Sequence, residues 1–360
     1  MEADSTTYDN TKPLNDDCFP FLVSAGNLKL YREFIENNSE KHLEHHIVDK
    51  LQSLGLLPDS VPCITKSPDC KVVRKPARVI DKVQWYCKVC KKRQPIRTGS
   101  FFMRVQCSLL QTLQIILAWC EDADYAIAAE HFNVKPKVAL MIYDKLDDLA
   151  VKEQSTYKLG GEGSVVLADL YPDCLNRLSP DTTDQPHVHR ILMLADTNHI
   201  PTHYQLHVIR GDMKKGDLIN STDDQALKSE IEHTVSVLTS PSSTVITGTS
   251  VPSLDGAATM QQLAQHCDLH MQHFLSTRIW RQAVSLCAAS RELCAGAAGA
   301  GAGAGGAGAG AACAGAVQRY LRAALCRLRL GDGLYQQALA LVARDYTDGN
   351  GGQHSLTPAV

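Results

Sequence analysis

The sequence predicts an α+β protein, in which a helical N-terminal part with a cysteine-rich segment and a helix-turn-helix-like pair precedes a mixed-sheet domain. Two observations predict this class. Apolar residues recur at helical spacing over 28–54 and 108–149, whereas from residue 160 they gather into short runs, as in buried strands. Those runs give three consecutive strands, then helix, strand, helix and strand, an order that favours a mixed sheet covered by helices.

Charge and cysteine content narrow the class of protein. The formal net charge is −3, so the 360-residue chain as a whole is not a polycation. It has 13 cysteines, an odd number, and no apolar segment near Met1 of the kind that a secretory signal has. We therefore expect a protein that is not secreted, with cysteines that serve as metal ligands or small buried residues. The apolar run 109–119 is too short to span a bilayer, so no membrane partner is expected.

Residues 1–58 are predicted to form an acidic, disordered tail and one helix. Five carboxylates lie in the first 17 residues. The helical pattern then runs from Leu28 to Leu54 with a charged face, and Pro58 lies just beyond its end.

Residues 59–104 form a cysteine-rich segment that is poor in apolar residues. A segment with so small a core needs a cross-link, such as a bound metal, to stabilise its fold. Cys87-x-x-Cys90 places two thiolates on one turn, a spacing that suits tetrahedral zinc, and Cys63 and Cys70 upstream can complete the ligand set. Two alternatives remain: thiols without a metal, and a redox dithiol. The redox pair would favour a helix start after a strand, whereas Lys91 and a basic run follow here.

Residues 66–104 of this segment concentrate positive charge, because twelve cations face only Asp69 and Asp81. The cations are Lys66, Lys71, Arg74, Lys75, Arg78, Lys82, Lys88, Lys91, Lys92, Arg93, Arg97 and Arg104. Cations at this density can neutralise several phosphates. The residues expected to contact DNA here are Lys88, Lys91, Lys92, Arg93 and Arg97. The alternative is a solvated charged face, with Trp85, Tyr86, Phe101 and Phe102 in the core.

Residues 105–155 predict a helix-turn-helix-like pair. A helix over Ser108–Trp119 comes first, then a helix over Tyr125–Phe132 that Asp122 or Asp124 can cap, then a third helix with Pro136 in its first turn. In such modules the N-terminal residues of the second helix of the pair enter the major groove. Lys135 and Lys137 suit phosphates there, and no Arg or Asn is placed to read a base. The alternative is two packed helices, since Asp144, Asp147 and Asp148 would repel DNA.

Residues 160–294 form the mixed-sheet domain. Its expected strands are SVVLADLY, HRILMLADT, HYQLHVIR, STVITG and DLHMQHF, and its expected helices cover 224–238 and 257–264. Residues 295–316 alternate Ala and Gly and are expected to be a flexible insert, because glycine is costly to order and neither residue builds a core. Residues 317–346 are expected to form C-terminal helices.

This order of features resembles the transposases of the Merlin superfamily over roughly residues 50–290. The residues that carry the resemblance are the cysteine cluster with W-x-C-x-x-C, the stretch IRTGSFF, an apolar helix ending in Trp119, the helix pair and the strand with Asp169. The resemblance implies an RNase H-like fold with a DDE triad of carboxylates. Asp169 then occupies the position of the first catalytic Asp, and MQHF at 271–274 resembles the family's Val-Asn-His segment, with His273 in place.

The sequence departs from the family at the carboxylates. Leu170 and Tyr171 replace the usual Glu-Ser, and Gly248 stands where the second Asp is expected. The third acid falls in the region of the Ala/Gly insert, with Glu292 nearby. Two-metal phosphoryl transfer needs carboxylates that hold two Mg²⁺ ions, and glycine has no ligand atom. Asp196, at the end of its strand, is a candidate substitute.

The function expected is that of a transposase-derived DNA-binding protein with a degenerate DDE site that does not cleave DNA. The alternatives are an active DDE transposase that uses Mg²⁺, a zinc-clipped interaction module without a nucleic-acid role, and a decaying gene product. The expected partner is double-stranded DNA, a homo-oligomer is left open, and no small-molecule substrate is identified. The resemblance implies nuclear residence, and cytoplasmic residence is the alternative.

Overall fold

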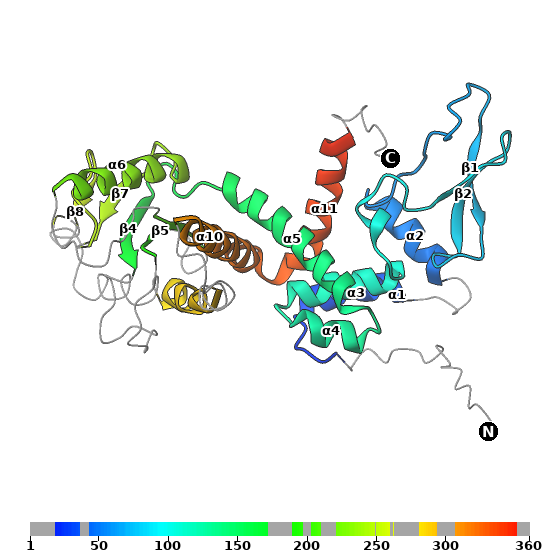
Figure 1. The fold of residues 1–360 in the computed structure, drawn as a ribbon, viewed down its shortest axis with the longest axis horizontal. Coiled ribbons are helices and arrows are strands. Elements are labelled where there is room, and N and C mark those ends of the chain that lie inside the picture. The colour runs from blue at the N-terminus through cyan, green and yellow to red at the C-terminus, as the bar shows by residue number, and fades with distance from the viewer. Residues whose placement is uncertain are drawn as a thin grey trace. The chain divides into compact units, whose positions relative to one another are not determined.

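A computed structural model of the chain describes residues 19–36, 43–171, 189–196, 203–209, 221–248, 250–259, 262, 281–293 and 307–350. Over these residues the protein is a mixed α/β structure with two sheets (Figure 1). The chain divides into two compact units, which are described separately. The first unit contains residues 1–146 and 332–360, and the second contains residues 147–331. No helix in the described ranges is long and apolar enough to cross a membrane.

The first unit begins with two helices where the sequence predicts one. α1 (Ala25–Ile35) ends at Glu36, whose backbone is extended (φ −69°, ψ 144°), and α2 (Leu43–Ser53) follows. The prediction of a continuous helix over 28–54 is therefore wrong. Apolar periodicity is present on both sides of the break, so the pattern alone does not reveal it. The predicted acidic tail, residues 1–18, lies outside the described residues.

A helix from the end of the chain completes the core of the first unit. α3 (Leu109–Cys120) begins at a capping box, in which Ser108 and Gln111 bond each other's backbone N–H groups. α11 (Leu334–Asn350) brings the fully buried Tyr335 against it, and the Tyr335 hydroxyl donates to the carbonyl of Leu113 at 3.3 Å. The Tyr335 N–H donates to Asn27 of α1 at 2.9 Å, so the buried helix start is satisfied.

The cysteine-rich segment forms a three-stranded antiparallel sheet of β1 (Val72–Pro76), β2 (Val83–Cys87) and β3 (Arg93–Pro95), followed by the short helix η1 (Phe101–Arg104). Trp85 is buried beneath it and donates its indole N–H to the carbonyl of Ile96 at 3.2 Å. A buried ion pair lies beside it. Arg97 Nε donates to Asp81 Oδ2 at 2.6 Å, and the guanidinium also donates to the carbonyls of Val105 and Cys107, each at 2.7 Å.

The second unit is built on a five-stranded mixed sheet with the strand order β6-β5-β4-β7-β8. Its strands are β4 (Val165–Tyr171), β5 (Ile191–Asp196), β6 (Tyr204–Val208), β7 (Thr244–Thr247) and β8 (Ala258–Thr259). β4, β5 and β6 are antiparallel neighbours, whereas β7 runs parallel to β4 and β8 parallel to β7. The expected mixed sheet is therefore confirmed.

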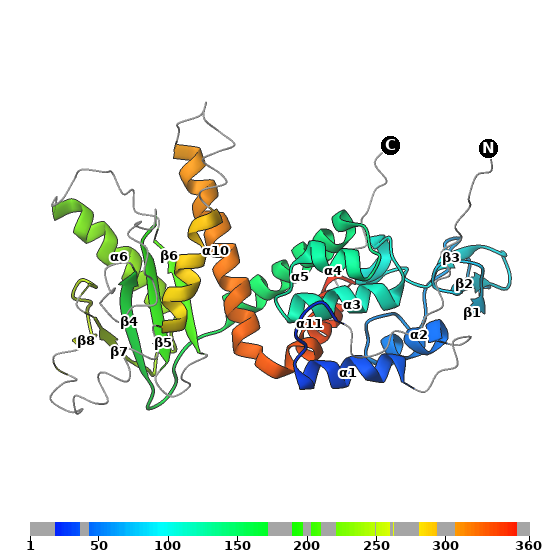
Figure 2. The ribbon, with the colours of Figure 1, turned by 90° about the horizontal axis from the view of Figure 1, so that it is seen from below.

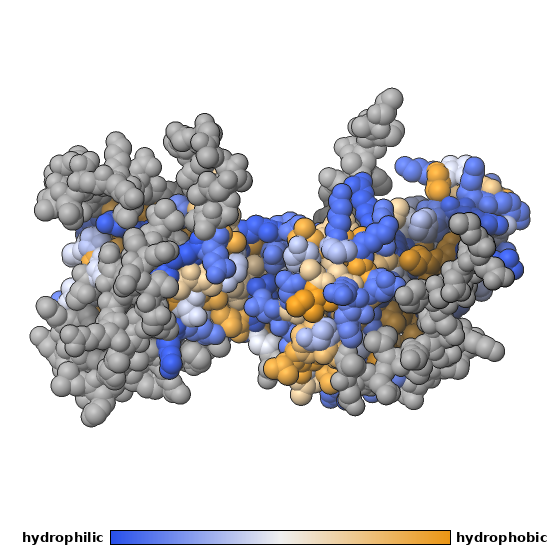
Figure 3. Space-filling view, turned by 60° about the horizontal axis from the view of Figure 1, so that its bottom comes forward, coloured by the Kyte–Doolittle hydropathy of each residue, from blue (hydrophilic) through white to orange (hydrophobic). Residues whose placement is uncertain are grey.

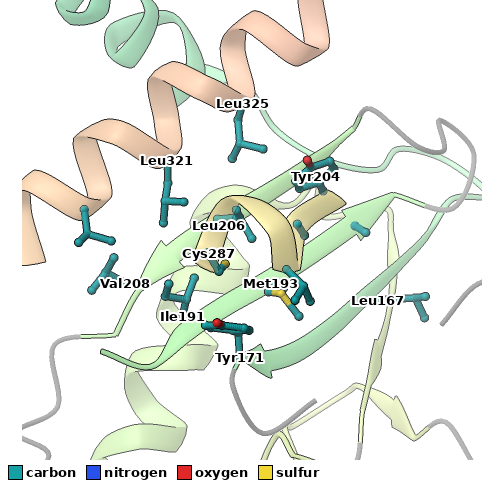
Figure 4. Close-up of a cluster of buried hydrophobic side chains, with 14 of the residues drawn as sticks. Leu167, Tyr171, Ile191, Met193, Tyr204, Leu206, Val208, Cys287, Leu321 and Leu325 are labelled. Atoms are coloured by element: carbon teal, nitrogen blue, oxygen red, sulfur yellow. The ribbon is translucent and has the colours of Figure 1, made fainter. Parts of the chain in front are cut away.

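Helices cover both faces of this sheet (Figure 2). α6 (Ser221–Leu238) packs Ile231 and Leu238 against one face. α10 (Ala307–Leu330) and the helix at residues 281–289 cover the other, where Leu321 and Leu325 lie over β6 (Figure 4). Gln318 of α10 accepts from Val208 N–H at 2.7 Å and donates to the carbonyl of Leu206 at 3.0 Å, so the edge strand β6 is covered.

Two local predictions in this unit are wrong. Residues 258–259 form β8 and not part of a helix over 257–264, because Ala258 pairs with Ile246 of β7. The Ala/Gly stretch 295–316 is not a flexible insert throughout, since α10 begins at Ala307. Alanine favours helix, and Cys313 and Ala314 pack against the sheet core. The expected strand DLHMQHF, at 268–274, lies outside the described residues.

The buried ion pair generates a stability prediction. Replacing Arg97 by Met leaves the Asp81 carboxylate buried without its partner, so we expect a loss of about 3–5 kcal/mol in the free energy of unfolding of the first unit. Urea unfolding followed by tryptophan fluorescence measures it, in a Trp280→Phe background so that Trp85 and Trp119 report. The exposed neighbour Arg93→Ala is the control, with an expected change within about 0.5 kcal/mol. A change in Arg97→Met as small as that of the control would contradict a structural role for the pair.

Candidate functional site

Four cysteines from two separate stretches of the chain converge beside the three-stranded sheet. Each of Cys63, Cys70, Cys87 and Cys90 offers a sulfur, and all four sulfurs lie within 4.8 Å of one another. Cys63 and Cys90 are 27 residues apart, yet their Sγ atoms are separated by only 3.2 Å. This is the set that the sequence predicts, so the structure brings all four expected ligands together.

Backbone turns hold the four thiols in place. Cys87 ends β2, and its N–H donates to the carbonyl of Lys92 at 2.9 Å while its carbonyl accepts from Lys91 N–H at 3.0 Å. Lys91 takes a left-handed conformation (φ 61°) to close this turn. On the other side of the cluster, Cys63 begins a turn in which its carbonyl accepts from Lys66 N–H at 2.9 Å. Cys63 and Cys70 thus reach the cluster from one loop despite their wide spacing.

The protonation of the cluster shows why a cation suits it. Burial, together with the thiols of Cys63, Cys87 and Cys90, raises the pKa of Cys70 to about 12. Hydrogen bonds from the Thr65 hydroxyl and the Lys92 backbone lower the pKa of Cys90 to about 6. Neighbouring thiolates repel one another, and this repulsion opposes the ionised form of such a cluster when no metal is bound. A bound divalent cation offsets that repulsion, so the cluster could bind a metal such as zinc.

The geometry argues against the two alternatives to a metal. Cys87 and Cys90 lie on a turn between two strands and not at the start of a helix, where a reactive dithiol is favoured. Four thiols within ligand distance of one another also differ from an ordinary buried thiol. Cys107 is an example of the latter: its sulfur lies 3.3 Å from the Thr112 hydroxyl, and it is not among the clustered cysteines.

The predicted DNA-contacting residues of the sheet fall into two groups. Lys88, Lys91, Lys92 and Arg93 are exposed around the turn that carries Cys87 and Cys90. Hydrophilic side chains predominate at that end of the molecule in Figure 3. Arg97 differs, because it is only 4% exposed and its guanidinium is bonded to Asp81, Val105 and Cys107. It is held in the interior and does not belong to the exposed basic surface.

The aromatic residues of this segment are mainly core. Trp85 and Phe102 are buried, whereas Tyr86 and Phe101 are half-buried. Lys75 lies over the ring of Tyr86 at 4.8 Å. The interpretation of these aromatics as core residues therefore fits better than stacking on bases.

The predicted helix pair is present as α4 (Tyr125–His131) and α5 (Pro136–Thr156). Asp124 caps α4 by accepting from the N–H groups of Ala126 and Ile127. In the turn, Asn133 is left-handed (φ 51°) and Val134 is buried, with its N–H donating to the carbonyl of Ala129 at 2.8 Å. Lys135 and Lys137 are both exposed at the start of α5.

Asp169 and Gly248 are neighbours in the second unit. Asp169 is half-buried on β4, and its Oδ1 accepts from the N–H of Leu170 at 2.9 Å. Gly248 follows β7, and its N–H continues the parallel ladder to the carbonyl of Ala168 at 2.7 Å. A Cβ added at Gly248 would lie 2.6 Å from Asp169 Cγ and 2.6 Å from Asp169 Oδ2. The carboxylate of Asp169 thus fills the space that a side chain at position 248 would need.

Asp196 cannot substitute for a side chain at position 248. Asp169 of β4 is paired with Met193 of β5, and Asp196 of β5 is paired with Val166 of β4. Along β4, Val166 and Asp169 are separated by an odd number of positions. Because side chains alternate between faces, Asp196 and Asp169 point to opposite sides of the sheet. Asp196 is buried there and accepts from the N–H of Gly160 at 3.2 Å.

A cation lies on the same face of the sheet as Asp169. Arg291 donates to the hydroxyl of Tyr171, and its guanidinium lies 5.8 Å from the centre of that ring. Tyr171 is two residues beyond Asp169 on β4, so both point to the face covered by α10. Glu292 is exposed, and His273 lies outside the described residues. Sequence reasoning missed Arg291, because nothing near it in the chain signals its contact with β4.

No family model matches the chain, and neither the curated proteins nor the solved structures provide a match.

The four-cysteine cluster predicts a metal-dependent first unit. The full-length chain purified without chelator is expected to hold about one zinc ion, because four thiolates match its tetrahedral preference. Cys87→Ser removes one ligand, so its zinc content by mass spectrometry of the metal should fall to near zero. Its melting temperature should fall with it, since metal binding and folding are coupled.

The matched control is Cys107→Ser, which alters a buried thiol outside the cluster and should keep the full zinc content. Equal zinc in Cys87→Ser and the wild-type chain would exclude this cluster as the metal site.

Proposed function

We propose that this protein is a transposase-derived DNA-binding protein with an RNase H-like scaffold that no longer cleaves DNA. Its three-stranded sheet is stabilised by zinc and is called the basic sheet, after the exposed cations Lys88, Lys91, Lys92 and Arg93. The observation that supports the proposal most strongly is that Asp169 lies directly beside Gly248. The position where the resemblance expects a second carboxylate lies directly beside the first, and it has no side chain.

The strand order supports the RNase H-like assignment. β4 occupies the centre of the sheet, with antiparallel β5 and β6 on one side and parallel β7 and β8 on the other. In it, Asp169, at the position of the first acid, lies on the first strand of the sheet, and Gly248, at the position of the second, lies just after the fourth. α6 lies between the third and fourth strands in the chain and covers one face.

The chemistry of the Asp169 face supports the loss of cleavage. Two-metal phosphoryl transfer needs several carboxylates around two ions about 3.5–4 Å apart. Here Asp169 faces the bare backbone of Gly248, and Asp196 points to the other face of the sheet. The guanidinium of Arg291, over the ring of Tyr171, places a positive charge on the same face of the sheet as Asp169. Among the described residues, Asp169 without a second carboxylate at position 248 is a poor site for two Mg²⁺ ions.

The basic sheet supports DNA binding. Lys88, Lys91, Lys92 and Arg93 are exposed on or beside one turn, which backbone hydrogen bonds between Cys87 and Lys91 and Lys92 close. Exposed cations held at fixed positions neutralise phosphates without ordering a flexible segment on binding. Lys135 and Lys137 add two cations at the start of α5. In this proposal the metal stabilises the surface that binds DNA and does not take part in chemistry.

The DNA-binding proposal is tested by its salt dependence. The variant Lys91→Ala with Lys92→Ala should weaken binding of the full chain to a duplex and make the negative slope of log K against log salt shallower by about 1.8, because each neutralised phosphate contributes about −0.9 to that slope. Fluorescence anisotropy with a labelled duplex of about 20 base pairs, at several salt concentrations, gives the slope.

The matched control removes the same charge elsewhere, with Lys29→Ala and Lys158→Ala, two exposed lysines outside the basic sheet. If both double variants change the slope equally, the basic sheet is not the contact surface. If the wild-type chain binds no duplex even at low salt, the zinc-clipped interaction module becomes the better account.

The degenerate site generates a gain-of-function prediction. Gly248→Asp places a second carboxylate beside Asp169, which must change rotamer to accommodate the new Cβ. We expect Mn²⁺ to bind at least about tenfold more tightly than to the wild-type chain, a gain of about 1.4 kcal/mol. Electron paramagnetic resonance of free Mn²⁺ measures the affinity.

The control is Gly248→Asp combined with Asp169→Asn, which should return Mn²⁺ binding to the wild-type level. DNA nicking by the wild-type chain with Mg²⁺ or Mn²⁺ that disappears in Asp169→Asn would show that cleavage persists, and would overturn this part of the proposal.

A further inference from the structure

The first two turns of α5 present a mixed basic and apolar surface. Val138, Ala139 and Ile142 are buried on the inner side of the helix. The residues that remain at the surface over these turns are Pro136, Lys137, Leu140, Met141 and Tyr143. Tyr143 is half-buried and its hydroxyl donates to the carbonyl of Ala123 at 3.0 Å, so it belongs to the internal packing. Leu140 is 41% exposed, and Met141 beside it is half-buried.

The chemistry of this surface changes sharply along the helix. Lys135 and Lys137 are exposed before and within the first turn. Further along the helix the acids are already paired, since Asp148 forms an ion pair with Arg319 of α10 at 2.9 Å. The two lysines therefore attract phosphates to the first two turns, where the outward side chains that follow them are Leu140 and Met141.

These two side chains can recognise only one group on a base edge. Hydrogen-bonded readout in the major groove uses Arg, Lys, Asn, Gln or carboxylates, whereas apolar side chains contact the C5-methyl group of thymine. Neither Leu140 nor Met141 has a donor or a strong acceptor. In a helix-turn-helix module the N-terminal part of the second helix is the part that reaches the bases.

We infer that α5 reads thymine methyl groups in the major groove through Leu140 and Met141, while Lys135 and Lys137 contact the flanking phosphates. The inference rests on the proposed function and adds a base preference to it: duplexes rich in A·T pairs, recognised by their methyl groups. Lys135 and Lys137 supply the charge complementarity that directs a duplex to this end of the helix.

Replacing thymine by deoxyuridine tests the inference directly, because it removes the methyl group and keeps the charge and the hydrogen-bonding groups of the base. The full-length chain is titrated with two labelled duplexes of the same alternating A·T sequence, one with thymine and one with deoxyuridine. The wild-type chain should bind the deoxyuridine duplex about fourfold more weakly for each methyl group contacted, equivalent to about 0.8 kcal/mol per buried methyl.

The variant Leu140→Ala with Met141→Ala should bind both duplexes with equal affinity. Val237→Ala, at an aliphatic residue of α6 that is 47% exposed, is the control and should keep the wild-type ratio. Equal binding of both duplexes by the wild-type chain would overturn the inference and leave the proposed function standing. Binding of neither duplex at low salt would overturn both, and a wild-type ratio in the double variant would assign the methyl preference to another surface.

Discussion

The first unit depends on the balance of charge among four sulfur atoms. Burial, together with hydrogen bonding to the other three thiols, raises the pKa of Cys70 to about 12, whereas hydrogen bonds from Thr65 and the Lys92 backbone lower the pKa of Cys90 to about 6. A bound divalent cation would favour the ionised thiols. The three-stranded sheet has few buried apolar side chains, so the cluster takes over much of the role of a core. The exposed lysines lie between or next to Cys87 and Cys90, on the turn that these two cysteines share.

The sheet of the second unit is held together without a side chain at position 248. The N–H of Gly248 still bonds to the carbonyl of Ala168, and the two cores on either side of the sheet are built from apolar side chains. Stability therefore does not require a side chain at position 248. Metal binding would require one, because glycine has no ligand atom. The alternation of side chains then prevents the nearest acid on the neighbouring strand, Asp196, from replacing it.

Several features followed from local sequence alone, each through a short-range physical rule. The capped starts of α3 and α4, Pro136 in the first turn of α5 and the strands β4 to β7 depend on neighbouring residues and on apolar periodicity. The ligand set of Cys63, Cys70, Cys87 and Cys90 followed as well, because thiols near one another in a segment without a core have few other uses. Even so, the wide spacing of the first two gave no hint of the turn at Lys66 that brings them to the cluster.

Other features were decided only by tertiary structure, because they depend on contacts between residues far apart in the chain. Arg97 belongs to the same basic run as Arg93, but its side chain is buried because it forms an ion pair with the buried Asp81. The Ala/Gly stretch is helical from Ala307, and Cys313 and Ala314 within it pack against a sheet assembled from residues far earlier in the chain. The meeting of Asp169 with Gly248 follows from the parallel pairing of β4 with β7. The sequence by itself determined which chemical groups are present, and the tertiary structure decided which of them face one another, because burial and strand pairing act across the whole chain.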